Sequence, residues 1–185
     1  SSGRETMNTK SGAVFPIDGV SLGVAAAGIK QVNRNDLALI SIIAGSTSAA
    51  IFTRNAFCAA PVEIAKRHLA SSTPRAALIN AGNANAGTGE AGLDAALICC
   101  EALASELSCD GAEVLPFSTG VIGEPLPVER IIGAIPDLCA SLSVDGWQSA
   151  ANAIRTTDTV DKLASGEYPL GASTIRVTGM SKGSG

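Results

Sequence analysis

A long segment of helical periodicity, Gly89–Leu107, lies between two short apolar segments and constrains the fold of this chain more than any other feature. Its apolar residues recur at a spacing that puts them on one face of a helix: Leu93, Ala96, Leu97, Cys100, Leu103 and Leu107. Residues 75–80 before it and 112–117 after it are predicted strands. This alternation of strands and helices predicts an α/β fold.

Other segments continue the alternation. Residues 37–44 and 49–53 are short, Ile-rich and bounded by Gly, Ser and Asn, which predicts two neighbouring buried strands. A proline at the first helical position opens a predicted short helix over residues 61–70. Residues 173–178 are a predicted last strand, and residues 182–185 a predicted flexible tail.

Prolines and a capping pattern mark two further helical segments. Pro125 and Pro127 introduce a helical stretch that Pro136 is expected to interrupt, because a proline inside a helix cannot donate a backbone hydrogen bond. Asp145, with a glutamine three residues later, resembles a capping arrangement for a predicted helix over residues 146–155.

Length and composition indicate the class of protein. With 185 residues, 46% of them hydrophobic, the chain can build one substantial core, and its length also fits half of a larger two-chain fold. We predict one domain over residues 7–185 and interpret residues 1–6 as an expression scar. The net charge of −4 argues against nucleic acid as a partner. The longest apolar run, residues 37–44, is far short of the roughly 20 residues of a membrane span, so we expect a cytoplasmic protein.

The cysteines and the single histidine predict neither a zinc site nor a histidine-based catalytic mechanism. Five cysteines without C-x-x-C spacing indicate reduced core residues rather than a zinc site or a disulfide framework. His68 is the only histidine, and we interpret it as a partly exposed structural residue. Acyl-transfer chemistry would therefore need another base, and an N-terminal α-amine, with an ordinary pKa of about 7.7–8.0, is one available substitute.

A dinucleotide-binding pattern is present but poorly placed. Residues 87–92 read G-x-G-x-x-G, with Glu113 about 20 residues further on. The fingerprint needs its first glycine at the turn that leaves the strand, whereas residues 81–86 intervene here. A glycine-rich loop that leads into a helix is the simpler interpretation, and a dinucleotide-binding module stays an alternative.

Three further polar segments could bind a small molecule. Residues 118–120 (STG) follow an apolar strand, and such a strand end can present a hydroxyl and a backbone N–H to one point, as an oxyanion hole requires. Taken alone, this tripeptide also fits a plain turn, residues 156–159 (TTDT) a solvated end of a helix, and Lys182 a surface cation.

Six segments, taken in order, resemble the ornithine acetyltransferase family. They are residues 24–30 (VAAAGIK), 50–55 (AIFTRN) with 59–62 (AAPV), 80–90 (NAGNANAGTGE), 118–127 (STGVIGEPLP), 154–159 (IRTTDT) and 180–185 (MSKGSG). The match extends from about residue 12 to residue 185. Six motifs in register are far more specific than any one of them.

The resemblance implies that the chain is the α subunit of a self-cleaving enzyme of the N-terminal-threonine acyltransferase type, with mixed-sheet and helix layers completed by a separate β chain. In that family the first threonine of the β chain is the nucleophile, and it is expected to lie outside this sequence. The resemblance further implies an oxyanion hole at Thr119 and Gly120 and substrate binding by Thr156 and Lys182. A lysine supplies a compact positive charge for a substrate carboxylate. No metal and no cofactor is implied.

The function implied is a step of arginine biosynthesis, in which an acetyl group moves from N-acetylornithine to glutamate through an acyl-enzyme. An α2β2 assembly is also implied. Some members of the family accept acetyl-coenzyme A as well, and no residue here decides that question. A self-cleaving aminopeptidase-type hydrolase of the same general architecture is the second interpretation, ahead of the dinucleotide-binding module.

Overall fold

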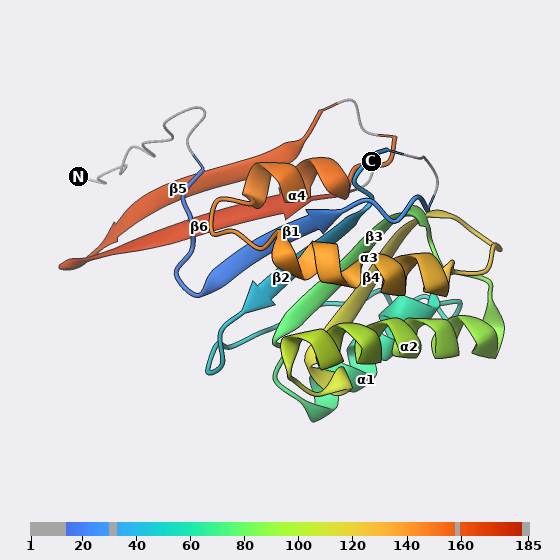
Figure 1. The fold of residues 1–185 in the computed structure, drawn as a ribbon. Helices are drawn as coiled ribbons and strands as arrows, with labels where there is room; N and C mark the ends of the chain where they lie inside the picture. Colours follow the sequence, from blue (N-terminus) through green and yellow to red (C-terminus); the bar gives the residue numbers. More distant parts are fainter. Residues whose placement is uncertain (1–13, 30–32, 158–159, 183–185) are drawn as a thin grey trace.

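The computed structural model describes residues 14–29, 33–157 and 160–182, and Figure 1 shows its elements in chain order. Residues 1–6 and the tail beyond Lys182, for which the sequence predicted an expression scar and a flexible end, lie outside the described residues. The elements are β1 (Val20–Ala25), β2 (Leu37–Ile42), α1 (Ala60–Ser71), β3 (Ala76–Asn83), α2 (Gly89–Leu107), a 3₁₀ turn (Gly111–Glu113), β4 (Val114–Val121), α3 (Val128–Ala140), α4 (Trp147–Ala153), β5 (Lys162–Leu170) and β6 (Ser173–Ser181).

Within the described residues, the main sheet has four strands in the order β1-β2-β3-β4. β2 is antiparallel to both β1 and β3, whereas β3 and β4 are parallel and are connected through α2. The sheet is therefore mixed, and the predicted α/β class with a mixed sheet is confirmed.

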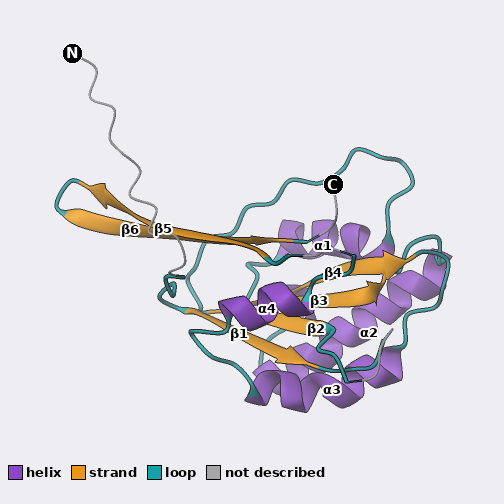
Figure 2. Ribbon diagram, turned by 90° about the horizontal axis from the view of Figure 1, so that it is seen from above, coloured by secondary structure: helices purple, strands orange, loops and turns teal. Residues whose placement is uncertain are grey.

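Apolar side chains on both faces of the sheet build two cores. On one face Leu37, Leu39 and Leu78 pack with residues of α1, α2 and α3. On the other face Leu22, Ala38 and Ile79 pack with α4 and are flanked by Leu163 and Met180 of the β5–β6 hairpin. Successive residues of a strand point to opposite faces, so strands with few polar residues are buried on both sides. Figures 1 and 2 show the resulting layers, with α4 and the hairpin on one side of the sheet and the three longer helices on the other.

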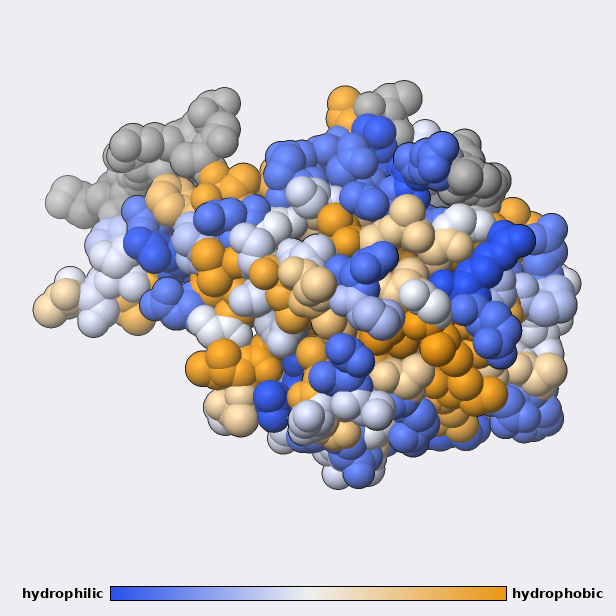
Figure 3. All heavy atoms as spheres, viewed as in Figure 1, coloured by the Kyte–Doolittle hydropathy of each residue, from blue (hydrophilic) through white to orange (hydrophobic). Residues whose placement is uncertain are grey.

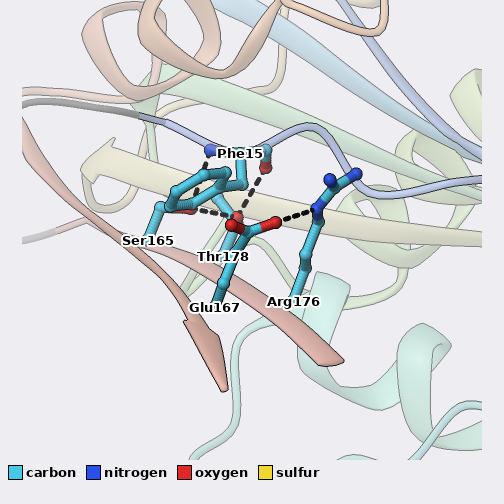
Figure 4. A network of polar contacts seen from close by, with 5 residues as sticks. All are labelled: Phe15, Ser165, Glu167, Arg176 and Thr178. Carbon is cyan, nitrogen blue, oxygen red and sulfur yellow. Dashed lines mark hydrogen bonds and ion pairs between the residues drawn. The ribbon is translucent and has the colours of Figure 1, made fainter. Parts of the chain in front are cut away.

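The β5–β6 hairpin forms a separate two-stranded sheet that extends beyond the main sheet (Figures 1 and 2). Polar contacts fasten it to the N-terminal segment (Figure 4): the Phe15 N–H donates to Ser165 Oγ at 2.8 Å, and Thr178 Oγ1 donates to the Phe15 carbonyl oxygen at 2.8 Å. Arg176 and Glu167 form an ion pair across the strands at 2.7 Å. The space-filling view shows hydrophilic and hydrophobic residues mixed over this part of the surface (Figure 3).

Several predicted elements are confirmed with small shifts of their ends. α2 has the predicted bounds, and α1 extends one residue beyond the prediction at each end. The predicted strands at residues 75–80, 112–117 and 173–178 correspond to β3, β4 and β6, each of which continues further toward its C-terminus.

The predicted strand over residues 49–53 is wrong. These residues form no strand, and the side chain of Ile51 is fully exposed. A strand needs a hydrogen-bonding partner and an apolar face to cover, and the short Ile-containing segment has neither here.

Two local predictions about helices are also wrong. α3 continues through Pro136, because the buried residues Ile131, Ile135 and Leu138 hold the helix against the sheet and outweigh the loss of one backbone hydrogen bond. Asp145 does not cap α4, whose N-cap is Gly146 without a side-chain cap hydrogen bond. The Asp145 N–H instead donates to Ser143 Oγ in the preceding turn.

Candidate functional site

The C-terminal ends of β3 and β4 pair closely at two glycines. Ala81 lies opposite Thr119 and Gly82 opposite Gly120, and the register of the two strands shifts immediately afterwards. Gly120 has φ +145° and Gly82 has φ +123°. A Cβ atom at Gly120 would collide with the backbone of Gly82 and Asn83. Glycine is therefore required at position 120 both by the backbone conformation and by the close approach of β3.

A cavity of about 360 Å³ opens at these strand ends. It is lined by residues from the segment just before β2, the ends of β3 and β4, and the end of α4 with the turn after it: Arg34, Asp36, Ala81, Gly82, Thr119, Gly120, Val121, Ala153, Arg155, Thr156 and Thr157. The structure thus brings the predicted site residues Thr119, Gly120 and Thr156 together, although Thr156 follows Thr119 by more than thirty positions in the sequence. A threonine hydroxyl can both donate and accept a hydrogen bond, so these residues suit a polar ligand.

Lys182, the fourth predicted site residue, follows the end of β6 and does not line this cavity. Its ammonium nitrogen is buried, and no described residue accepts a hydrogen bond from it. Burial lowers the pKa of Lys182 from an ordinary value of 10.5 to about 8. A buried ammonium without an acceptor is costly and favours a nearby anion.

Asp36 is a buried carboxylate in the cavity wall that the sequence analysis did not single out. Its two oxygens accept hydrogen bonds from the backbone N–H groups of Ala27 and Ile29, at 2.7 and 2.6 Å. Its carbonyl oxygen accepts from the Ala81 N–H at 2.8 Å. Asp36 therefore ties the turn after β1 and the start of β2 to β3 beside the cavity.

Three buried asparagines, two in the last part of β3 and one just after it, support the same region. Asn80 Nδ2 donates to the Asn83 carbonyl oxygen at 2.8 Å, and Asn80 Oδ1 accepts from Ser118 Oγ at 2.5 Å. Asn83 Nδ2 donates to the Pro125 carbonyl oxygen at 3.0 Å. Asn85 Oδ1 accepts from Thr88 Oγ1 at 2.8 Å. These bonds replace the regular ladder where β3 ends and satisfy polar groups that would otherwise be buried without a partner.

The structure gives the glycine-rich segment a packing role. β3 ends at Asn83 and α2 begins only at Gly89, so Gly87 does not lie at the turn that leaves the strand. Asn85 Nδ2 donates to the Gly92 carbonyl oxygen at 2.8 Å, and a Cβ atom at Gly92 would collide with the side chain of Thr88. The glycines thus admit the polar side chains that connect strand and helix.

The lone histidine and the cysteines have structural surroundings. His68 is buried rather than partly exposed, and its Nδ1 donates to the Val114 carbonyl oxygen at 2.7 Å, which joins α1 to β4. Cys99 and Cys100 are buried on α2, where burial raises the pKa of each thiol to about 12. Within the described residues the structure contains no group of three or more His, Cys, Asp or Glu side chains able to hold a metal ion.

No helix in the described ranges is both long and apolar enough to cross a membrane.

Residues 21–185 match the ArgJ family. The chain belongs to the ArgJ family. Its relatives include the arginine biosynthesis bifunctional protein ArgJ of Pseudomonas syringae pv. tomato, with 53% identity over 173 residues, and that of Psychrobacter arcticus, with 48% identity over 172 residues. These matches cover 94% and 93% of this chain but only 42% of each relative, so the chain spans less than half of their length.

Solved ArgJ-family structures have the same fold. ArgJ of Bacillus halodurans superposes with a TM-score of 0.84 and 34% identity, covering 91% of this chain and 88% of that chain. The ornithine acetyltransferase of Mycobacterium tuberculosis, solved in complex with ornithine, superposes with a TM-score of 0.85 and 35% identity. That match covers 92% of this chain and 90% of that chain.

Proposed function

We propose that this chain is the α part of an acetyltransferase of arginine biosynthesis that moves an acetyl group from N-acetylornithine to glutamate. The observation that carries the proposal is the convergence of Thr119, Gly120 and Thr156 on one cavity in a chain of the ArgJ family. The similar protein of Mycobacterium tuberculosis is an ornithine acetyltransferase that binds ornithine, which supports ornithine as the product of the first half-reaction.

The proposed reaction has two steps that share one site. The hydroxyl oxygen of a threonine at the N-terminus of a β chain attacks the acetyl carbonyl of N-acetylornithine, and its proton passes through the threonine's own α-amine to the departing nitrogen of ornithine. The C–N bond breaks and an acetyl-threonine ester remains. The amine of glutamate then attacks the ester, the C–O bond breaks, and the proton returns to the threonine oxygen. Each step passes through a tetrahedral oxyanion, and the Thr119 hydroxyl and Gly120 N–H are its proposed donors.

Thr156 and Lys182 are the proposed binding residues for the parts of the substrates that do not react. Both substrates carry an α-carboxylate, and the buried ammonium of Lys182 has no acceptor among the described residues. A substrate carboxylate would provide one. Because burial lowers the pKa of Lys182 to about 8, this contact would be strongest below that pH.

The proposal includes a β chain cut from the same precursor, an α2β2 assembly and a cytoplasmic location. The five free cysteines suit a reducing compartment. Acetyl-coenzyme A as a second acetyl donor is a separate question, which the same assay answers when that donor replaces N-acetylornithine.

The test starts from the protein expressed from its complete gene and purified under native conditions. Denaturing intact-mass measurement with N-terminal sequencing should find a second chain that begins with threonine, and labelled acetyl should move from N-acetylornithine to glutamate. A single uncleaved chain would remove the proposed mechanism. Release of free acetate at the same rate without glutamate would favour the hydrolase instead.

A further inference from the structure

Among the described residues, three charged side chains line the cavity, and two of them have partners that stabilise their charge. The carboxylate of Asp36 accepts the N–H groups of Ala27 and Ile29. The guanidinium of Arg155 forms an ion pair with Asp161, with 3.5 Å between Nη1 and Oδ1. These charges are engaged with the protein itself.

Arg34 is the third charged side chain and has a different environment. Its Nη2 donates to the Arg155 carbonyl oxygen at 2.6 Å, which anchors the guanidinium in the cavity wall. This acceptor is neutral, and within the part of the chain that the structure describes Arg34 forms no ion pair. A guanidinium has five N–H donors in a planar fork, so most of them remain for a ligand. The half-buried Arg34 therefore offers the cavity a fixed positive charge without a carboxylate partner.

We propose that Arg34 binds the side-chain carboxylate of the acyl acceptor and so selects glutamate in the second half-reaction. This inference rests on the proposed function. One site must then accept N-acetylornithine, whose side chain ends in an amine, and glutamate, whose side chain ends in a carboxylate. The α-carboxylate is common to both and is assigned to Lys182. The γ-carboxylate occurs only in the acceptor, and a planar arginine fork matches it with two parallel hydrogen bonds.

The donor N-acetylornithine carries a positive side-chain charge, so its half-reaction should respond to Arg34 differently from that of glutamate. The side-chain ammonium of N-acetylornithine gains nothing from Arg34 and is repelled by it at short range. Removing the charge of Arg34 should therefore weaken the acceptor step while leaving the donor step unchanged or slightly improved. A residue that only supported the fold would affect both steps alike.

The experiment compares wild type, Arg34→Gln and the control Arg67→Gln, each expressed from the complete gene. Arg67 is an exposed arginine on α1 that does not line the cavity. Rapid-quench measurement of ornithine release without acceptor reports the donor half. Steady-state kcat/KM for glutamate and for glutamine reports the acceptor half, because glutamine has a neutral amide in place of the γ-carboxylate.

Arg34→Gln should lower the ratio of kcat/KM for glutamate over glutamine by roughly 10- to 100-fold, as expected for the loss of a charge-assisted contact. The rate of ornithine release without acceptor should stay within about twofold of wild type. Arg67→Gln should change neither this rate nor the ratio of kcat/KM for glutamate over glutamine. An unchanged ratio of kcat/KM for glutamate over glutamine, or equal losses in the donor and acceptor half-reactions, would overturn the assignment. If the cleaved wild-type enzyme releases no ornithine from N-acetylornithine, the proposed function itself fails, whatever the variant does.

Discussion

Replacing Thr119 by alanine should separate catalysis from stability. Thr119 is half-buried at the end of β4, and its side chain forms no hydrogen bond within the described part of the chain. Truncation therefore removes at most one partly buried methyl group and leaves no buried polar group without a partner, a cost below about 1 kcal/mol in the free energy of unfolding. If its hydroxyl donates to the oxyanion, kcat should fall about 10²- to 10³-fold, which corresponds to about 2.7–4 kcal/mol in the activation free energy.

The matched control is Thr119→Ser, which removes the same methyl group and keeps the hydroxyl. Both variants are expressed from the complete gene, kcat is measured for acetyl transfer to glutamate at saturating substrates, and stability is measured by urea unfolding. The alanine variant should lose activity while the serine variant retains most of it, and both should unfold at nearly the wild-type midpoint. Equal kcat values for the two variants would refute the role of the hydroxyl, as would a loss of kcat that follows a loss of stability.

Three further predictions concern the surroundings of the cavity. Lys182→Ala should raise KM for both amino acids, and the wild-type KM should rise above pH 8 as the ammonium loses its proton. Between pH 8 and 10.5 the unfolded chain binds more protons than the folded chain, so the free energy of unfolding should increase with pH there. Urea unfolding of Lys182→Met over the same pH range should lack this increase. Gly120→Ala should destabilise the protein by roughly 2 kcal/mol or more, since its Cβ would collide with the backbone of β3 at φ +145°, and an unchanged thermal midpoint would contradict this. Asn85→Ala should cost about 1–3 kcal/mol in urea unfolding because the Gly92 carbonyl loses its buried donor, whereas the exposed Asn35→Ala should have little effect.

Helices were predictable from the sequence where their signal is contained in the segment itself. The apolar period of α2 continues over several turns, and the predicted bounds agree with the structure. α3 shows the limit of such local rules. Its apolar face continues past Pro136 and packs on the sheet, and this tertiary contact outweighs a residue that on its own indicates a break.

Strands whose residues are chosen by tertiary contact could not be predicted. β1 contains Gly23 in its middle, which argues against a strand, yet a Cβ atom there would collide with the Leu138 carbonyl oxygen of α3. β5 contains Gly166 and Pro169, which are typical of turns, and both are tolerated because β6 is the strand's one neighbour among the described residues. The reason for Gly23 thus lies in a distant part of the chain, whereas the residues of β5 are tolerated because of the strand's edge position.

In the candidate site, too, the sequence indicated some residues and missed another. Thr119, Gly120 and Thr156 belong to segments that resemble motifs of the ornithine acetyltransferase family, and this resemblance indicated them, whereas each segment alone also fits a turn or the end of a helix. Arg34 gives no such signal. Its position in the cavity depends on a hydrogen bond to the carbonyl oxygen of Arg155, 121 positions away in the sequence. A contact of this kind is visible only after the chain has folded.

The proposed oxyanion donors owe their position to the interior of the protein rather than to a surface loop. Thr119 and Gly120 directly precede the last residue of β4, and the neighbouring strand β3 contains the buried Asn80 and ends at the buried Asn83. Asn80 holds Ser118, and Asn83 holds the carbonyl oxygens of Glu124 and Pro125 on the far side of the glycine pair. Both flanks of the site are thus fixed before any ligand arrives. Donors held in this way need little reorganisation when charge develops on a carbonyl oxygen, which is the physical condition for stabilising a tetrahedral intermediate.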